Sequence, residues 1–312
     1  MKRHVGTIIV GTVFGIGVFF VFQHAQNPSK SSLTGVAPIV QNVQAFILPI
    51  AQITYHPIRD FNIPEPVIGA RAAILMDAKS GRILFAKQAD QRMPIASITK
   101  LMSAIVILEH LDLSSTYTVA AEDLNVDGIG PDFVKGEQFI GSDLFMLMLM
   151  KSSNDAVSVF ATALHEQGFD IVDLMNQKAR DFGMTSTHFA DPAGLDDNDT
   201  YSTAIDVVAL MHATQTLPSI TRPLTTREAS IYTRGGRMYH VTNTNQLLSV
   251  IPEIEIGKTG NTTGALGTMA LGVRVSTTGD EIMSVILGSA DRFGDTRKLI
   301  TWGKQAHKWE LP

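Results

Sequence analysis

Ser97 and Lys100 have the side chains and the spacing that nucleophilic catalysis needs. Positions i and i+3 of a helix share a face, so the serine hydroxyl and the lysine amine can meet. A serine hydroxyl is a weak nucleophile until a neighbouring base takes its proton. Lysine is such a base only where burial, nearby positive charge or the first turn of a helix lowers its pKa. The pair therefore predicts an activated serine nucleophile.

The pattern Ser-x-x-Lys is weak by itself, because about one match is expected by chance in a chain of 312 residues. An exposed serine and lysine on a helix would give the same letters. Two further triplets, in order along the chain, support the catalytic interpretation.

The second triplet, Ser152-Ser153-Asn154, lies between an apolar run and a helical pattern that starts at Asp155. A loop serine and asparagine there can supply a hydroxyl for proton relay and an amide for a substrate carbonyl. A helix N-cap is the competing interpretation, since Ser, Asn and Asp all favour that position. The triplet alone does not separate the two.

The third triplet, Lys258-Thr259-Gly260, lies in a predicted strand. Its lysine adds a positive charge that keeps Lys100 neutral and attracts an anionic substrate. Its glycine lets a substrate backbone approach the strand closely. A solvated lysine before a glycine turn gives the same letters, and Lys79-Ser80-Gly81 also fits but precedes the nucleophile. The order of the elements, rather than the triplet, separates the two matches.

The elements that must position these residues can be read from hydrophobic periodicity. Strand-like runs at 72–76 and 83–85 flank a Ser-Gly turn and predict a hairpin. Pro94 precedes a helical pattern that contains Lys100. Further helical patterns cover 142–182, 203–214 and 295–308, and strand-like runs cover 254–256, 268–275 and 281–287. Strands at both ends with helices between them predict an α/β (α+β) fold, with an antiparallel sheet flanked by helices and an inserted helical subdomain.

Composition excludes several classes of function. The chain has no cysteine, which rules out disulfides and thiolate metal sites, and its nine histidines show no metal-ligand spacing. We therefore expect no metal and no cofactor. A net charge of −5 without a dense basic cluster argues against a nucleic-acid partner.

The N-terminus predicts the compartment. Lys2, Arg3 and His4 precede an uncharged, mostly apolar run, 5–22, which as a helix at about 1.5 Å per residue would span roughly 27 Å of bilayer. Basic residues before such a run keep the N-terminus cytoplasmic. We therefore expect the chain to sit in the cell membrane with its catalytic part outside the cytoplasm.

Three regions follow from this organisation. Residues 1–25 form a membrane anchor or signal segment, a proline- and serine-containing linker covers 26–67, and a catalytic domain covers 68–312. Ala25 could be a cleavage residue, but Gln23 is a poor partner for the small-x-small cleavage pattern. We therefore favour an uncleaved anchor.

The three triplets in this order resemble the active-site signature of penicillin-recognising serine enzymes. The similarity extends over residues 68–304. The stretches that carry it are 94–102, 151–156, Met175-Asn176, 191–195, 201–204 and 285–288. Together they resemble the low-molecular-weight penicillin-binding proteins, or D-alanyl-D-alanine carboxypeptidases, whose fold is that of the β-lactamases and transpeptidases.

The resemblance implies a role for each candidate residue. Ser97 attacks the bond between two terminal D-alanines of a peptidoglycan pentapeptide, Lys100 is its base, and Ser152 relays the proton. The implied substrate-binding residues are Asn154, Lys258, Thr259 and Gly260, with the backbone N–H groups of Ser97 and Asn261 as the oxyanion hole. β-Lactams are implied as inhibitors that acylate Ser97.

The chain departs from the family pattern at a few positions. Ser153 stands where the family usually has Gly, Asp191 where it often has Asn, and Ala193 where a bulkier or polar residue is usual. The residues 261–263 after Gly260 are also uncommon, and the chain stops soon after the catalytic domain, which leaves anchoring to the N-terminal segment. These departures bear on substrate preference.

Other activities stay open beside the carboxypeptidase. A D,D-endopeptidase acting on peptidoglycan cross-links needs the same catalytic groups. A serine β-lactamase is disfavoured, since no Glu-Pro-x-Leu-Asn-like loop follows Ser152. A non-catalytic cell-wall-binding protein would have no need for the base Lys100.

Overall fold

A computed structural model describes residues 57–124, 133–195 and 199–309. The predicted membrane segment 1–25 and most of the predicted linker lie outside the described residues. Within those ranges, the structure contains no helix that is both long and apolar enough to cross a bilayer.

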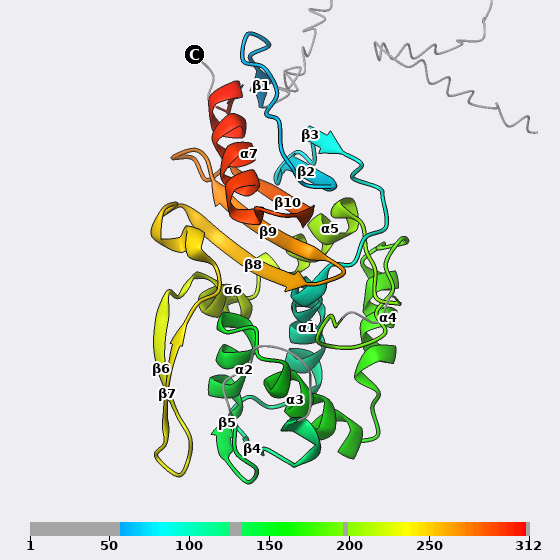
Figure 1. The fold of residues 1–312 in the computed structure, drawn as a ribbon, viewed down its shortest axis with the longest axis vertical. Coiled ribbons are helices and arrows are strands. Elements are labelled where there is room, and N and C mark those ends of the chain that lie inside the picture. Colours follow the sequence, from blue (N-terminus) through cyan, green and yellow to red (C-terminus); the bar gives the residue numbers. More distant parts are fainter. Residues whose placement is uncertain (1–56, 125–132, 196–198, 310–312) are drawn as a thin grey trace, which may run out of the picture. The chain divides into compact units, whose positions relative to one another are not determined.

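A five-stranded antiparallel sheet carries the third triplet on its edge (Figure 1). Its order is β3 (Ile83–Lys87), β2 (Ala72–Asp77), β10 (Glu281–Ser289), β9 (Leu266–Arg274) and β8 (Ile254–Thr262). The predicted hairpin and the three later strands are confirmed. Strand β8 includes the third triplet, as predicted, and continues past the apolar run 254–256 because its polar second half pairs with β9 as far as Leu266. Because β8, the strand that contains Lys258, is the last strand of the sheet, one of its edges pairs with no other strand of the described fold.

Helices cover both faces of the sheet. Helix α7 (Arg292–Ala306) packs on one face and α5 (Ala204–Gln215) lies at the other (Figure 1). Side chains of β10 alternate between the two, as the pleat of a strand requires. Ile282 and Ile286 pack in the same cluster as Trp302 of α7, whereas Met283 and Val285 join the core of the helical region.

The helical region is inserted in sequence between β3 and β8, as predicted. Its helices are α1 (Lys100–His110), α2 (Gly141–Met150), α3 (Asn154–Glu166), α4 (Ile171–Asp181) and α6 (Pro218–Thr225). A single turn of 3-10 helix, η1 (Ala96–Thr99), leads into α1. Every residue of α1 from Lys100 to Ile107 is buried, so the helix that follows the nucleophile is fixed from all sides.

Periodicity did not predict helix α6 or several short polar strands. These strands form three two-stranded sheets: β4 (Thr116–Thr118) with β5 (Gln138–Ile140), β6 (Glu228–Tyr232) with β7 (Met238–Thr242), and β1 (Ile58–Arg59) with β11 (His307–Lys308). Two further 3-10 turns are η2 (Glu122–Leu124) and η3 (Gln246–Ser249). The closing helix also ends at Ala306 rather than Lys308, because the chain turns there into the pairing with β1.

Candidate active site

Ser97 lies on a tight turn whose backbone is held under strain. The preceding residue, Ala96, has a left-handed φ of 49°, which is costly for a residue with a side chain. Gly194 packs directly against this turn, and a Cβ on Gly194 would overlap the carbonyl oxygen of Ala96. Ser97 itself is half-buried and lines a cavity, so its hydroxyl is presented to a ligand.

The side chain of Lys100 reaches back to Ser97. Its Nζ lies 3.0 Å from Ser97 Oγ, 2.6 Å from Asn154 Oδ1 and 2.7 Å from the carbonyl oxygen of Ala193. Lys100 is completely buried, and burial lowers its pKa to about 7, although the carboxylate of Asp191 acts in the opposite direction. Near neutral pH a large share of the amine is therefore unprotonated and able to accept the Ser97 proton.

The carboxylate of Asp191 shapes the loop behind Lys100. It accepts backbone N–H bonds from Ala193 and Gly194, each at 2.7 Å, and from Leu195 at 3.1 Å. These bonds form a tight turn that points the Ala193 carbonyl at Lys100. The two residues that depart from the family pattern, Asp191 and Ala193, thus lie next to the predicted base Lys100. The contact with Lys100 is made by the backbone oxygen of Ala193 and not by its side chain.

The three residues of the second triplet make different contacts. Ser153 is the N-cap of α3, and its Oγ accepts a bond from the backbone of Ala156 at 3.2 Å. Ser152 has a left-handed φ of 62°, and its Oγ accepts a bond from Lys258 Nζ at 2.8 Å. Asn154 turns its Oδ1 to Lys100. The middle residue stabilises the helix, and its two neighbours belong to the site.

Lys258 is the second buried lysine of the site, with only 1% of its surface exposed. Its Nζ donates to Ser152 Oγ and to the Thr259 carbonyl, both at 2.8 Å. Burial lowers its pKa well below the ordinary value, and the charges of Lys100 and Arg292 lower it further. The charge of Lys100 therefore disfavours the protonated form of Lys258.

Gly260 packs against the nucleophile turn and also lines the cavity. A Cβ there would lie 2.9 Å from the backbone nitrogen of Ser97 and would overlap Thr268 Oγ1. The glycine thus lets strand β8 pack on the nucleophile turn, and close approach of a substrate backbone to Gly260 stays a prediction. This close contact places the adjoining Asn261 beside the Ser97 turn.

Thr259 and Asn261 extend the site along β8. Thr259 Oγ1 lies 2.6 Å from Thr244 Oγ1, and Asn261 Oδ1 accepts a bond from Arg292 at 3.2 Å. The exposed Asn261 and the buried Thr259 both line the cavity.

The cavity has a volume of about 190 Å³. Six of the eight predicted site residues line it. The other two, Lys100 and Lys258, do not line the cavity but are hydrogen-bonded to the lining residues Ser97 and Ser152, respectively. None of the described residues that line the cavity carries a carboxylate. Further lining residues, which sequence reasoning missed, are Lys151, Gly194, Leu195, Thr244, Thr262 and Arg292. Arg292 follows a strand end as an isolated arginine, so no local pattern marks it, and only the fold brings it to β8.

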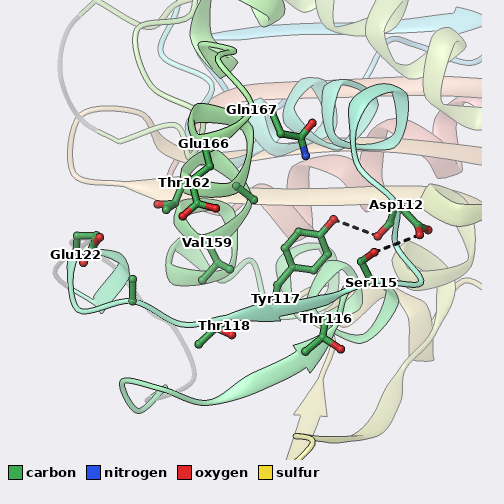
Figure 2. A pocket seen from close by; sticks show the side chains of 12 residues that line it. Asp112, Ser115, Thr116, Tyr117, Thr118, Glu122, Val159, Thr162, Glu166 and Gln167 are labelled. Atoms are coloured by element: carbon green, nitrogen blue, oxygen red, sulfur yellow. Dashed lines mark hydrogen bonds between the residues drawn. The ribbon is translucent and has the colours of Figure 1, made fainter.

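A larger cavity, of about 560 Å³, lies between α3 and β4, and Figure 2 shows its side chains. Its lining includes Tyr117 and Glu166, with the Tyr117 hydroxyl bonded to the Asp112 carbonyl at 3.1 Å. Its described lining includes hydroxyls and carboxylates but no lysine or histidine that could activate a nucleophile. Across the described residues, no cluster of His, Asp or Glu could hold a metal ion.

Comparison with known proteins matches residues 60–291 to the family model for D-alanyl-D-alanine carboxypeptidases. The chain is 31% identical over 257 residues to a D-alanyl-D-alanine endopeptidase of Pseudomonas aeruginosa, covering 78% of this chain and 80% of that protein. It is 27% identical over 198 residues to the D-alanyl-D-alanine carboxypeptidase DacF of Bacillus subtilis, covering 62% of this chain but only 51% of that protein. The chain thus spans about half the length of that relative.

Solved structures show the same fold. A D-alanyl-D-alanine carboxypeptidase from Mycobacterium tuberculosis superposes with a TM-score of 0.70 at 28% identity, over 81% of this chain and 99% of that one. The Streptomyces K15 DD-transpeptidase gives a TM-score of 0.71 at 23% identity, over 77% of this chain and 99% of that one.

Proposed function

The chain belongs to the D-alanyl-D-alanine carboxypeptidase family, and we propose that it removes the terminal D-alanine of peptidoglycan stem peptides through an acyl-enzyme on Ser97. One observation carries the proposal. The amine of Lys100, wholly buried and with its pKa lowered to about 7, lies 3.0 Å from the Ser97 hydroxyl. A nucleophile and a matched base in contact are what serine acyl transfer needs.

In acylation, Lys100 takes the Ser97 proton as Oγ bonds to the carbonyl carbon between the two D-alanines. The oxyanion is held by the backbone N–H groups of Ser97 and Asn261, each worth about 3 kcal/mol in such sites. The C–N bond then breaks, and the proton held by Lys100 passes through Ser152, whose Oγ is bonded to Lys258, to the leaving amine of D-alanine, so that Lys100 is neutral again. Lys100 next takes a proton from water as its oxygen bonds to the ester carbonyl carbon. The bond from that carbon to Ser97 Oγ breaks, the shortened peptide leaves as a carboxylic acid, and Lys100 returns the proton to Oγ.

The positive lining of the cavity supports a substrate with a free terminal carboxylate. Arg292 and the hydroxyl of Thr259 line it, and Lys258 lies next to Thr259. An arginine and a hydroxyl are a common pair for binding a carboxylate. Among the described lining residues there is no carboxylate that would repel this anion.

A fluorescent penicillin tests the acyl-enzyme. The protein should take the label covalently at a ratio near one, and Ser97→Ala should take none. Labelling of Ser97→Ala would contradict the proposal, because the acyl group would then be on another nucleophile. No labelling of the folded protein would also contradict it and would favour a non-catalytic cell-wall-binding protein. Rapid loss of the label would point to a β-lactamase.

Cleavage of cross-links is the second candidate activity, favoured by the similarity to an endopeptidase over 80% of that protein's length. The same acylation step would cut a D-alanyl bond to a second peptide. Mass spectrometry of products from defined muropeptides separates the two. Loss of one alanine from a monomer indicates a carboxypeptidase, and splitting of a dimer indicates an endopeptidase.

We propose further that residues 5–22 anchor the chain in the cell membrane, with the catalytic domain outside the cytoplasm. The basic residues 2–4 before an uncharged apolar run support this arrangement. Fractionation of cells should recover the protein with the membranes, and protease added to spheroplasts should digest its catalytic domain. Recovery of the intact chain in the soluble cytoplasmic fraction would refute the anchor.

A further inference from the structure

Lys151 lies immediately before Ser152 at the C-terminal end of α2, and it lines the active-site cavity. It is half-buried, and none of the ion pairs or side-chain hydrogen bonds of the described residues involves its ammonium group. The mechanism above gives it no role. A lysine that lines a substrate cavity without an acidic partner is a candidate for contact with the substrate itself.

The position of Lys151 at the end of a helix favours a positively charged side chain that can bind a ligand in the cavity. It caps α2, with its backbone N–H bonded to Leu147 at 3.1 Å, so it lies at the negative end of the helix dipole. The backbone is also tied on the other side, since Thr244 N–H bonds to the Met150 carbonyl at 3.0 Å. The Lys151 backbone is therefore fixed between two elements, while its side chain borders the cavity.

The cavity carries its cations on separate elements. Arg292, at the start of α7, is bonded to Asn261 of β8, and Lys258 belongs to the same strand. Lys151 belongs instead to the connection between α2 and α3. The terminal carboxylate of the substrate is already provided for by Arg292 and Thr259. Lys151 is left for a second anionic group.

We propose that Lys151 selects acyl donors that carry a second carboxylate, on the part of the peptide that becomes attached to Ser97. This inference rests on the proposed function and names its substrate class. Among the residues that the structure describes, no acidic side chain lines the cavity, and this supports the proposal because none of them competes for the ammonium group. Lys151 is a specificity-determining residue, with no part in the proton transfers.

Two peptides of equal shape test the proposal. Both have the form acetyl-X-D-Ala-D-Ala, where X is 2-aminopimelic acid in one and its side-chain carboxamide in the other. The wild type should prefer the carboxylate in kcat/KM by roughly tenfold, the factor expected for one charge-assisted hydrogen bond. In Lys151→Gln the ratio should fall to about one, mainly through KM, and Lys151→Arg should retain most of it.

Lys298→Gln is the matched control, since it removes the same charge from an exposed position of α7 that does not line the cavity. Its ratio should equal that of the wild type. Equal ratios in wild type and Lys151→Gln would overturn the assignment. A ratio that falls equally in Lys298→Gln would overturn it too, since the preference would then come from net charge.

Binding to Ser97→Ala separates this proposal from the proposed function. Calorimetry of the two peptides with Ser97→Ala and with Ser97→Ala/Lys151→Gln reads the preference without any chemistry. If penicillin fails to label Ser97 but the carboxylate preference depends on Lys151, the catalytic proposal fails and the subsite stands. If labelling succeeds and the calorimetric preference does not depend on Lys151, the subsite fails alone.

Discussion

Lys258 and Ser152 lie 106 positions apart in the chain, yet the ammonium nitrogen of one is 2.8 Å from the hydroxyl oxygen of the other. This contact joins the edge strand of the sheet to the connection between two helices of the inserted region. A matching contact joins Lys100 to Asn154, across 54 positions, at 2.6 Å. The two buried lysines thus fasten the two halves of the site to each other.

Replacing the base should abolish acylation. In Lys100→Met the Ser97 hydroxyl loses its proton acceptor, and we expect the rate of penicillin acylation to fall by roughly a hundred- to ten-thousandfold. Lys100→Arg keeps a positive charge and donors but does not give up its proton near neutral pH, so it should be equally slow. Stopped-flow labelling measures both, with Lys298→Met as the control. A fast Lys100→Arg variant would exclude Lys100 as the base.

The acylation rate should increase with the fraction of Lys100 that is unprotonated. Its pKa is about 7, so the rate should rise with pH through that value and level off above it. Labelling rates between about pH 5 and pH 9 give the profile. A rate that does not change with pH across this range would be incompatible with a lysine base of that pKa.

The same shift makes stability depend on pH. The pKa of Lys100 is about 7 in the folded protein and near 10.5 in the unfolded chain, so between these values the unfolded chain binds more protons. The free energy of unfolding should therefore rise with pH across this window, relative to Lys100→Met, and the full penalty should be present below about 7. Urea unfolding of both proteins at several pH values measures the difference. A difference that stays constant with pH would show that Lys100 is not buried in its neutral form.

Two adjacent serines should give opposite results. Ser152→Ala removes the proton relay, and we expect peptide hydrolysis to slow by roughly a hundredfold, with little change in the thermal midpoint. Ser153→Ala removes the N-cap of α3 and should destabilise the fold by about 1 kcal/mol while most activity remains. Calorimetry and peptide hydrolysis on both variants check this. The reverse assignment of effects would mean that Ser153 is the relay.

Gly260→Ala should destabilise the protein and block acylation. Its new Cβ would lie 2.9 Å from the Ser97 backbone, which cannot move aside as a flexible side chain would. Such overpacking typically costs about 1–3 kcal/mol. Gly235→Ala is the control, because its nearest atom would be 3.7 Å away. A labelling rate for Gly260→Ala equal to that of Gly235→Ala would show that β8 can shift away from Ser97.

Arg292→Gln should weaken the grip on the terminal carboxylate. We expect KM for a D-Ala-D-Ala peptide to rise by roughly tenfold or more, the range for loss of one charged hydrogen bond, with a smaller change in kcat. For a substrate whose terminal carboxylate is amidated, the same substitution should raise KM much less. Equal losses for both substrates would show that Arg292 acts on the fold of β8 rather than on the carboxylate.

The site residues that could be predicted from the sequence are those in the three short motifs that follow one another in a fixed order along the chain. Ser97 and Lys100 are neighbours on one turn, so local spacing already brings them together. The sequence order of the triplets then selected Lys258 over Lys79. In the fold, the hairpin and the long strands could be predicted because their apolar runs pack on both faces of one sheet.

Contacts that depend on the tertiary fold were not predictable. The Ala193 carbonyl reaches Lys100 only because Asp191 ties the loop, and Arg292 reaches Asn261 only because α7 starts beside β8. The packing of Gly260 on the Ser97 backbone is a contact of the same kind, since only the fold brings β8 to the nucleophile turn. Short strands such as β6 and β7 have too few apolar positions for a clear period.

The pairing of Ile58–Arg59 with His307–Lys308 brings the first and last strands of the described fold side by side. A short peptide could therefore link the two ends, and the chain could be opened instead at an exposed turn such as Gly235–Gly236, between β6 and β7. A circularly permuted chain of this kind would keep every contact around Ser97. Its new N- and C-termini would lie between β6 and β7, where another protein could be fused to the catalytic domain.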